Sequence, residues 1–322
     1  MQCYGYRPFH FFISFRMVKM LQNIWQMFLV CTALVLSLPL FAAEPSVESM
    51  HIQIARTVFR LEHQEVISRP GQEKPETVLK PDGTAFVVQH NDHDYLVTAG
   101  HVAKLGYDLR ARVPAKRMDN QATEVIELYV PKESWVFHKS GPEIKEWRKG
   151  KARFYGVDVA VTPLLGIKDR TIVSFRSCSP CSQGVKSQLA PDDPLPPLSV
   201  LITGFPSELG LNLTEQRPLF RSGIVALVAS ESLLPVDGAF VDERSFVIDI
   251  RVQPGNSGSP VFNSDLFSGE IHLVGLVSAT SDGGEFTIAE PASRIREAIE
   301  HAIEKPPVKQ PKWDFLRSED GM

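Results

Sequence analysis

The stretch QPGNSGSPVF, residues 253–262, places a serine where the composition predicts a sharp turn. Ser257 lies between Asn256 and Gly258, and Gly255 comes two residues before it. Glycine lets a chain turn sharply and lets another molecule approach the backbone closely. A serine held on such a turn is either a nucleophile with hydrogen-bond donors beside it or simply a polar turn residue. The rest of the sequence decides between these two interpretations.

Short apolar runs separated by Gly, Pro, Asn and Asp lie on both sides of this turn. Runs of this kind with turn residues between them are typical of all-β sandwiches and barrels. We expect strands at 57–61, 83–89, 95–99, 125–130, 135–137, 157–164, 199–205, 222–229, 244–252, 259–262 and 271–279. The sequence therefore predicts an all-β sandwich or a pair of barrels.

One helix is predicted, over residues 291–305. Pro291 begins it, two prolines follow it, and its apolar residues recur at helical spacing on one stripe, Ile295, Ala298, Ile299, Ala302 and Ile303. Residues 306–322 are expected to form a polar tail. The segments 139–156 and 178–197 are predicted to be long loops, of which the second joins the two halves of the domain.

The composition is that of an ordinary globular protein, with 43% hydrophobic and 22% charged residues. The formal net charge of −4 argues against a large cationic surface for nucleic acid.

The first 42 residues differ from the rest, because they contain three cations and no acid ahead of an apolar run. Positive charges, an apolar segment and small residues in this order are typical of a secretory signal peptide. We expect cleavage after Ala42 or Ala43 and export to the periplasm or the medium. An uncleaved membrane anchor is the alternative. The long segment before Met17 also leaves Met17 and Met20 as alternative starts to Met1.

Two cysteines, Cys178 and Cys181, remain after the predicted signal peptide. In an oxidising compartment the first interpretation of this pair is a short-loop disulfide. Two free thiols are the alternative, and a zinc site would need about four ligands, whereas no second Cys or His pair lies nearby in the sequence.

Two further residues carry chemistry that a nucleophilic serine requires. His101, in YLVTAGHVA, follows directly after a predicted strand, where small residues lead into a helical turn. Asp158, in YGVDVAVTPL, stands in an apolar strand, and a buried carboxylate is costly unless it is paired or hydrogen-bonded. A serine needs a base within hydrogen-bond reach, and that base needs an orienting group. A solvated loop histidine and a solvent-facing aspartate are the alternatives.

The motifs TAGH (98–101), DVAV (158–161) and GNSGSP (255–260) together resemble the chymotrypsin-like serine peptidases, which use His, Asp and Ser in this order. The runs LITGFP, SGIVA and VIDIRVQPGNSGSPVFN are similar to second-barrel strands of bacterial trypsin-like peptidases, including the Deg type. The similarity covers about residues 54–304 and includes no PDZ domain. It implies two packed Greek-key β-barrels, at about 54–170 and 198–290, followed by the helix.

The resemblance also implies roles for particular residues. Ser257 would be the nucleophile, His101 the general base and then the general acid, and Asp158 the group that orients the imidazole. The N–H groups of Gly255 and Ser257 would form the oxyanion hole. The hydroxyl of Ser278 would support Asp158, and the backbone of Ser278, Ala279 and Thr280 would pair with an extended substrate.

The sequence departs from this family in two places. Asn256 stands where digestive relatives have an aspartate that pairs with a new N-terminus, so we expect no such activation. Ser259 replaces a glycine of the usual pattern, which leaves the geometry of the turn open.

The specificity pocket is expected near Arg251 and Thr280. Arg251 lies six residues before the serine, where cleavage after Lys or Arg usually needs an acid, and Thr280 would narrow the opening. We therefore expect a small or medium uncharged residue before the cut, with an acidic residue as the second choice.

The sequence thus predicts a secreted or periplasmic serine endopeptidase that needs no cofactor and no metal and whose partner is a polypeptide substrate. His90 and His93 suggest a metal site, but a polar hairpin is the better interpretation. The cations at 145–153 are expected on a solvated loop.

A peptide-binding or envelope-partner module of the same fold, with little catalysis, is the alternative function, and an esterase is a third. No stable membrane insertion is expected after signal cleavage, and no oligomeric state is indicated.

Overall fold

The computed structural model describes residues 54–315, with gaps at 56, 69–74, 92, 118–122, 142, 149–150, 165–169, 173–196, 208–217, 229–243, 264–271 and 282–283. All of these residues belong to one unit of the chain, Val47–Met322. The predicted signal peptide and the predicted disulfide between Cys178 and Cys181 lie outside the described residues, so both stay predictions.

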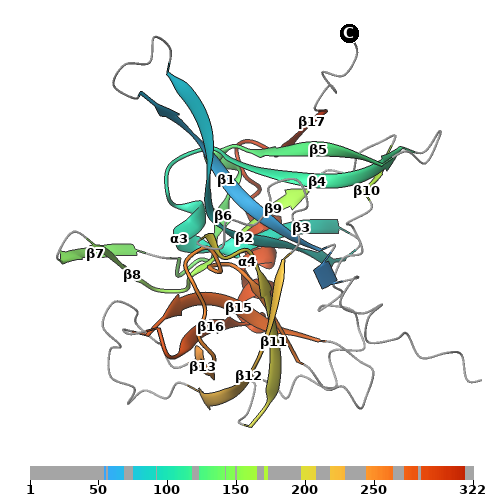
Figure 1. Ribbon diagram of the computed structural model, residues 1–322. Helices are drawn as coiled ribbons and strands as arrows, with labels where there is room; N and C mark the ends of the chain where they lie inside the picture. Colours follow the sequence, from blue (N-terminus) through green and yellow to red (C-terminus); the bar gives the residue numbers. More distant parts are fainter. Residues whose placement is uncertain are drawn as a thin grey trace, which may run out of the picture. The chain divides into compact units, whose positions relative to one another are not determined.

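Nine strands form the first sheet (Figure 1). In order of pairing they are β17 (Lys312–Phe315), β5 (Thr123–Val130), β4 (Leu109–Arg117), β1 (Val58–Ile67), β2 (Glu76–His90), β3 (His93–Ala99), β9 (Val159–Leu164) and β6 (Val136–Phe137), with β10 (Arg170–Ile172) paired to β4. Every pair among them is antiparallel.

Six further antiparallel strands close into a barrel. They pair in the order β11 (Ser199–Gly204), β12 (Leu219–Val228), β13 (Phe246–Asp249), β16 (Thr287–Pro291), β15 (Leu273–Thr280) and β14 (Pro260–Asn263). Buried Val, Ile and Phe side chains fill the barrel, among them Ile202, Val225, Phe246 and Ile248. The prediction of an all-β fold with two β-barrels and a C-terminal helix is confirmed, although only the second barrel forms a closed ring of paired strands among the described residues.

The helix α4 (Ala292–Glu304) contacts β9 and β6 of the first sheet and β15 and β16 of the barrel. Ile295, Ala298, Ile299 and Ala302 are buried in a core that also contains first-sheet residues, so the helix packs against both halves. Ile303, which was expected on the same stripe, is instead 52% exposed. It lies at the edge of the apolar face, one turn after Ile299.

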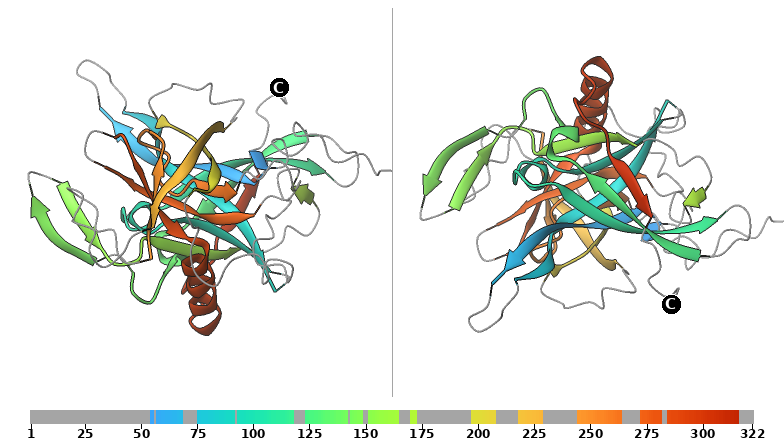
Figure 2. Two further views of the ribbon diagram at one scale, coloured as in Figure 1. Left: turned by 90° about the horizontal axis from the view of Figure 1, so that it is seen from below. Right: turned by 90° about the horizontal axis from the view of Figure 1, so that it is seen from above.

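Besides the short strands β10 and β16, three parts of the chain contain strands that the sequence did not predict. The segment 139–156, expected to be a loop, carries the hairpin of β7 (Glu143–Arg148) and β8 (Lys151–Tyr155), which extends away from both sheets (Figure 2). Strand β17 lies within the segment expected to be a polar tail and pairs with β5. Strand β4 was not predicted because it contains Pro114 and several cations, which are uncommon within strands.

Two short helical turns complete the described elements, α3 (Gly100–Ala103) and the 3₁₀ turn η1 (Lys132–Ser134). The residues around His90 and His93 form the tight β2–β3 hairpin, in which these two histidines face each other in the register. Within the described ranges, no helix has the length and apolar character needed to cross a membrane.

Candidate active site

His101 projects from the first turn that follows a buried strand. Strand β3 ends at Ala99 and the chain passes directly into α3, so the histidine is held by the sheet behind it. Strands β3 and β9 pair with Ala99 opposite Val159, and this register brings the residue before β9, Asp158, beside α3.

The Asp158 carboxylate binds His101 twice. Its Oδ1 accepts the backbone N–H of His101 at 2.7 Å, and its Oδ2 lies 2.7 Å from His101 Nδ1. The hydroxyl of Ser278, on β15 of the barrel, donates to the same Oδ2 at 2.6 Å. The structure therefore brings three of the predicted site residues together, from the first sheet and from the barrel.

The electrostatic interaction between Asp158 and His101 favours the charged form of each side chain. Burial opposes ionisation of Asp158, but the charge of His101 and the hydrogen bonds from His101 and Ser278 outweigh it and lower the pKa of Asp158. Burial likewise opposes protonation of His101, but Asp158 outweighs it and raises the pKa of His101. The side chain of His101 is 24% exposed and that of Asp158 is 9% exposed, so the imidazole is the more accessible group of the two.

Ser257 lies on a tight turn that local hydrogen bonds define. Asn256 N–H donates to Gln253 O at 3.1 Å, Ser259 N–H donates to Asn256 O at 2.9 Å, and the Asn256 side-chain amide donates to Gln253 O at 3.0 Å. Gly255 has φ +91° and Gly258 has φ +84°, a region that other residues rarely adopt. The two glycines are therefore required by the backbone of the turn itself.

The turn is pressed against the strand that leads to His101. A Cβ atom on Gly258 would lie 2.1 Å from Thr84 O and 2.9 Å from Ala99 N. On the other side, a Cβ atom on Gly83 would lie 2.9 Å from a methyl group of Val102 and 3.0 Å from Ser257 O. The Ser257 turn and the His101 turn are thus packed within van der Waals contact of the same residues of β2.

Thr84, which no sequence motif indicates, connects the turn to the first sheet by hydrogen bonds. Its N–H donates to Ser257 O at 2.8 Å and its hydroxyl donates to Gly255 O at 2.8 Å. The same hydroxyl accepts the N–H of Phe205 at 3.1 Å, and Thr84 O accepts the hydroxyl of Thr98 at 2.7 Å. These contacts fix the carbonyl groups on both sides of Asn256.

The barrel holds the turn from the other direction. Gly258 N–H donates to Val277 O at 2.7 Å, and Val277 N–H donates to Ser259 O at 2.8 Å. Val277 directly precedes Ser278, so the strand that supports Asp158 also supports the residues after Ser257. In the described part of the chain, no acceptor takes the N–H of Gly255 or Ser257.

The two departures in this motif are accommodated locally. Ser259 is fully buried, and its Oγ lies only 1.9 Å from the point where a Cβ atom on Gly204 would be. A glycine in β11 thus makes room for the serine that replaces a glycine in the turn. The amide of Asn256 hydrogen-bonds within the turn, where the family pattern would have a carboxylate.

Of the residues predicted for substrate recognition, Ala279 and Thr280 lie at the end of β15 and pair with Ile288 and Thr287 of β16. Thr280 is exposed. Arg251 is exposed as well, and its Nε lies 3.8 Å from the position of a Cβ atom on Gly284. The carbonyl group of Arg251 accepts a hydrogen bond from Arg221 at 2.6 Å.

No group of three or more potential metal ligands occurs among the residues that the structure describes. His93 Nδ1 lies 2.7 Å from the backbone carbonyl of Asn91, within the β2–β3 hairpin.

The family described as "Trypsin-like peptidase domain" matches residues 83–276, more than half of the chain, a span that contains His101, Asp158 and Ser257. Among solved structures, the chain is similar to the HtrA-type protease AlgW with a decapeptide, at 16% identity over 79% of this chain and 68% of that chain, with a TM-score of 0.45. A variant of AlgW with a decapeptide is similar at 15% identity over 80% of this chain and 67% of that chain, with a TM-score of 0.44. No curated protein matches the chain significantly.

Proposed function

The chain belongs to the trypsin-like peptidase domain family, and on this premise we propose that it is a serine endopeptidase with Ser257, His101 and Asp158 as its catalytic residues. The observation that carries the proposal is the double hydrogen bond from His101 to Asp158, directly beside the turn of Ser257. With Nδ1–H bound to Asp158, a neutral imidazole has its lone pair on Nε2, as a general base requires.

The reaction follows from these positions. Ser257 Oγ forms a bond to the scissile carbonyl carbon while its proton passes to His101 Nε2, and the π electrons move onto the carbonyl oxygen. The N–H groups of Gly255 and Ser257 stabilise that oxyanion. The carbon–nitrogen bond then breaks as His101 returns the proton to the leaving amine. Water, deprotonated by His101, attacks the acyl-enzyme and releases the acid and Ser257.

An extended polypeptide is the substrate that this site favours. The pairing of β14 with β15 ends at Leu276, so residues 278–280 continue beyond β14, and of these Ala279 and Thr280 pair with β16. We propose that a substrate strand hydrogen-bonds along Ser278, Ala279 and Thr280 and so delivers its scissile bond to Ser257.

The test is hydrolysis of a mixed peptide library by the purified chain, analysed by mass spectrometry, with Ser257→Ala as the matched control. We expect new peptide termini with the wild type and none with the variant. Binding of peptides without cleavage by either protein would contradict the proposal and favour a peptide-binding module of the same fold.

We further propose that the chain is exported and that residues 1–42 are removed, because of the cation, apolar and small-residue order at the N-terminus. N-terminal sequencing of protein from the producing cell tests this. A start at Ala43 or Glu44 supports export with cleavage, and a start before Leu29 contradicts it.

A further inference from the structure

A second buried carboxylate lies behind Asp158, and the mechanism above does not use it. Glu290, the fourth residue of β16, is 4% exposed, and Arg294, in the first turn of α4, is 3% exposed. The two form an ion pair across one turn. Burying a charged pair gains little net stability, because desolvation offsets the attraction. A role beyond stability is therefore worth seeking.

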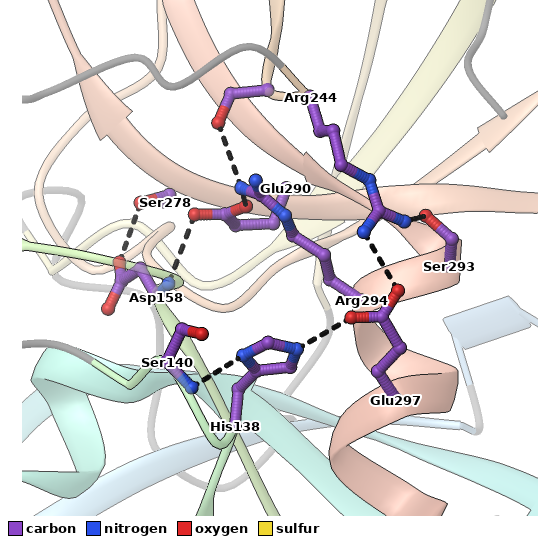
Figure 3. A network of polar contacts seen from close by, with 10 residues as sticks. His138, Ser140, Asp158, Arg244, Ser278, Glu290, Ser293, Arg294 and Glu297 are labelled. Carbon is purple, nitrogen blue, oxygen red and sulfur yellow. Dashed lines mark hydrogen bonds and ion pairs between the residues drawn. The ribbon is translucent and has the colours of Figure 1, made fainter.

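The contacts of this pair lead to the main chain of Asp158 (Figure 3). Glu290 Oε1 accepts the backbone N–H of Asp158 at 3.0 Å, while Glu290 Oε2 accepts Arg294 Nη1. The same Nη1 lies 3.3 Å from the hydroxyl of Ser245. Glu290 thus joins helix α4 to the main chain of Asp158.

The helix reaches the same segment by a second route. Glu297 lies 2.8 Å from His138 Nε2, and the N–H of Ser140 donates to His138 Nδ1 at 3.1 Å. The carbonyl group of Ser140 accepts the N–H of Val157 at 2.8 Å. Figure 3 shows the part of this route from Glu297 through His138 to Ser140. The residue before Asp158, Val157, is therefore held by α4 as well.

We propose that Glu290, held by Arg294, is a positioning residue that fixes the main chain of Asp158 and balances the charge of Arg294 behind the triad. Its catalytic consequence rests on the function proposed above. Asp158 is buried, so its backbone N–H needs an acceptor within the protein, and Glu290 supplies it.

The charged groups near Glu290, among the described residues, form an inner and an outer set. Arg294 of α4 and Asp158 face it directly, and His101 lies beyond Asp158. Arg244, Glu297, His138 and Lys139 form the outer group around the helix. Burial raises the pKa of Glu290, while Arg294 and the N–H of Asp158 oppose that rise. Loss of the Glu290 charge would remove a negative charge from behind Asp158 and so disfavour protonated His101.

Two variants separate the charge from the hydrogen bond. Glu290→Gln keeps an acceptor for Asp158 N–H but removes the charge, and we expect the acid limb of kcat/KM to move to lower pH by about half a unit. The double variant Glu290→Met with Arg294→Met removes both charges and the acceptor. We expect its acid limb to match the wild type, while kcat falls about tenfold or more and KM stays within about twofold.

Glu127→Gln is the matched control, because Glu127 is also a buried carboxylate paired with an arginine, Arg110, but lies on β5, which contributes no residue to the site. We expect it to lower the unfolding midpoint and to leave the pH profile in place. Apolar replacement of a buried ion pair is often tolerated, so the double variant should fold. The proposal would be overturned if the acid limb of kcat/KM stayed in place in Glu290→Gln and kcat stayed unchanged in the double variant.

A readout that needs no turnover separates this proposal from the catalytic one. In a Ser257→Ala background, the pKa of His101 is measured by NMR of its imidazole nitrogens, with and without Glu290→Gln. A lower His101 pKa in the Glu290→Gln protein supports the charge-balancing role of Glu290 even if the wild type cleaves no peptide. An unchanged His101 pKa refutes it even if the wild type is an active peptidase.

Discussion

The hydroxyl of Thr84, on β2 of the first sheet, donates a 2.8 Å hydrogen bond to the carbonyl group of Gly255, on the turn that carries Ser257. Thr84 is fully buried, and its N–H also binds Ser257 O. One residue of the first sheet thus holds the backbone on both sides of Asn256. The proposed oxyanion donors depend on this backbone, so their placement depends on Thr84.

Thr84→Val keeps the shape of the side chain and removes the hydroxyl. It leaves Gly255 O and Phe205 N–H without this partner in a buried site, which costs about 1–3 kcal/mol in the free energy of unfolding. We expect kcat to fall about tenfold or more, because a displaced oxyanion donor is costly. Urea unfolding and peptide hydrolysis measure the two effects. Thr84→Ser should retain most of both, and an equal loss in the serine variant would argue against the hydrogen bond.

Gly258 and Gly106 form a matched pair for the packing of the turn. Both have positive φ, +84° and +86°, but a Cβ atom on Gly106 meets nothing within 4 Å. Gly106→Ala should therefore cost only the backbone strain, about 1 kcal/mol. Gly258→Ala should cost about 3 kcal/mol or more and abolish activity, because its Cβ would strike Thr84 O. Similar urea midpoints for the two variants would show that the turn is not closely packed against β2.

Activity should rise with pH as His101 loses its proton. Since Asp158 raises the pKa of His101, the acid limb of kcat/KM should lie above the pH expected for an ordinary histidine. In Asp158→Asn the limb should move to lower pH and the plateau should fall by about 10⁴-fold. A limb that stays in place in the variant would show that another group titrates.

The shifted pKa values of Asp158 and His101 also make the free energy of unfolding depend on pH, in opposite directions. The lowered pKa of Asp158 contributes stability above the pKa of the unfolded carboxyl, and this is lost as pH falls through the folded value. The raised pKa of His101 contributes stability below the pKa of the unfolded imidazole, lost as pH rises through the folded value. Asp158→Asn should therefore flatten the plot of unfolding free energy against pH at both ends.

The residue preference before the cut is expected to be small or medium and uncharged, with an acidic residue second. Arg251 is exposed close to Gly284, and a cation there disfavours a Lys or Arg side chain in the substrate. Chromogenic peptides that differ only at this residue measure the preference. A dominant preference for Lys or Arg would contradict it and indicate an acidic side chain from another loop.

The sequence predicted those parts of the fold whose signals are local. Helix α4 follows from apolar spacing within one segment, and the motifs around His101, Asp158 and Ser257 are each contiguous. Strand β17 was not predicted because its partner, β5, lies far away in the chain. The hairpin β7–β8 was not predicted because a charged, glycine-containing segment is typical of a solvated loop.

The residues that support the site could not be predicted from the sequence for a related reason. Thr84 and Glu290 are ordinary strand residues in sequence, and their importance comes from hydrogen bonds to Gly255 and Asp158, across long sequence separations. No local pattern reports such contacts. The tolerated Ser259 likewise depends on Gly204, which the sequence gives no reason to pair with it.

The central claim, that Ser257 is an activated nucleophile, is tested most directly by labelling the purified chain with a fluorophosphonate and mapping the adduct by mass spectrometry. Neutral His101, oriented by Asp158, should activate the Ser257 hydroxyl alone among the serines of the chain. The account predicts one adduct, on Ser257, that is lost in Ser257→Ala and strongly slowed in His101→Ala. A folded wild-type protein that takes up no label, or labels equally in His101→Ala, would contradict it.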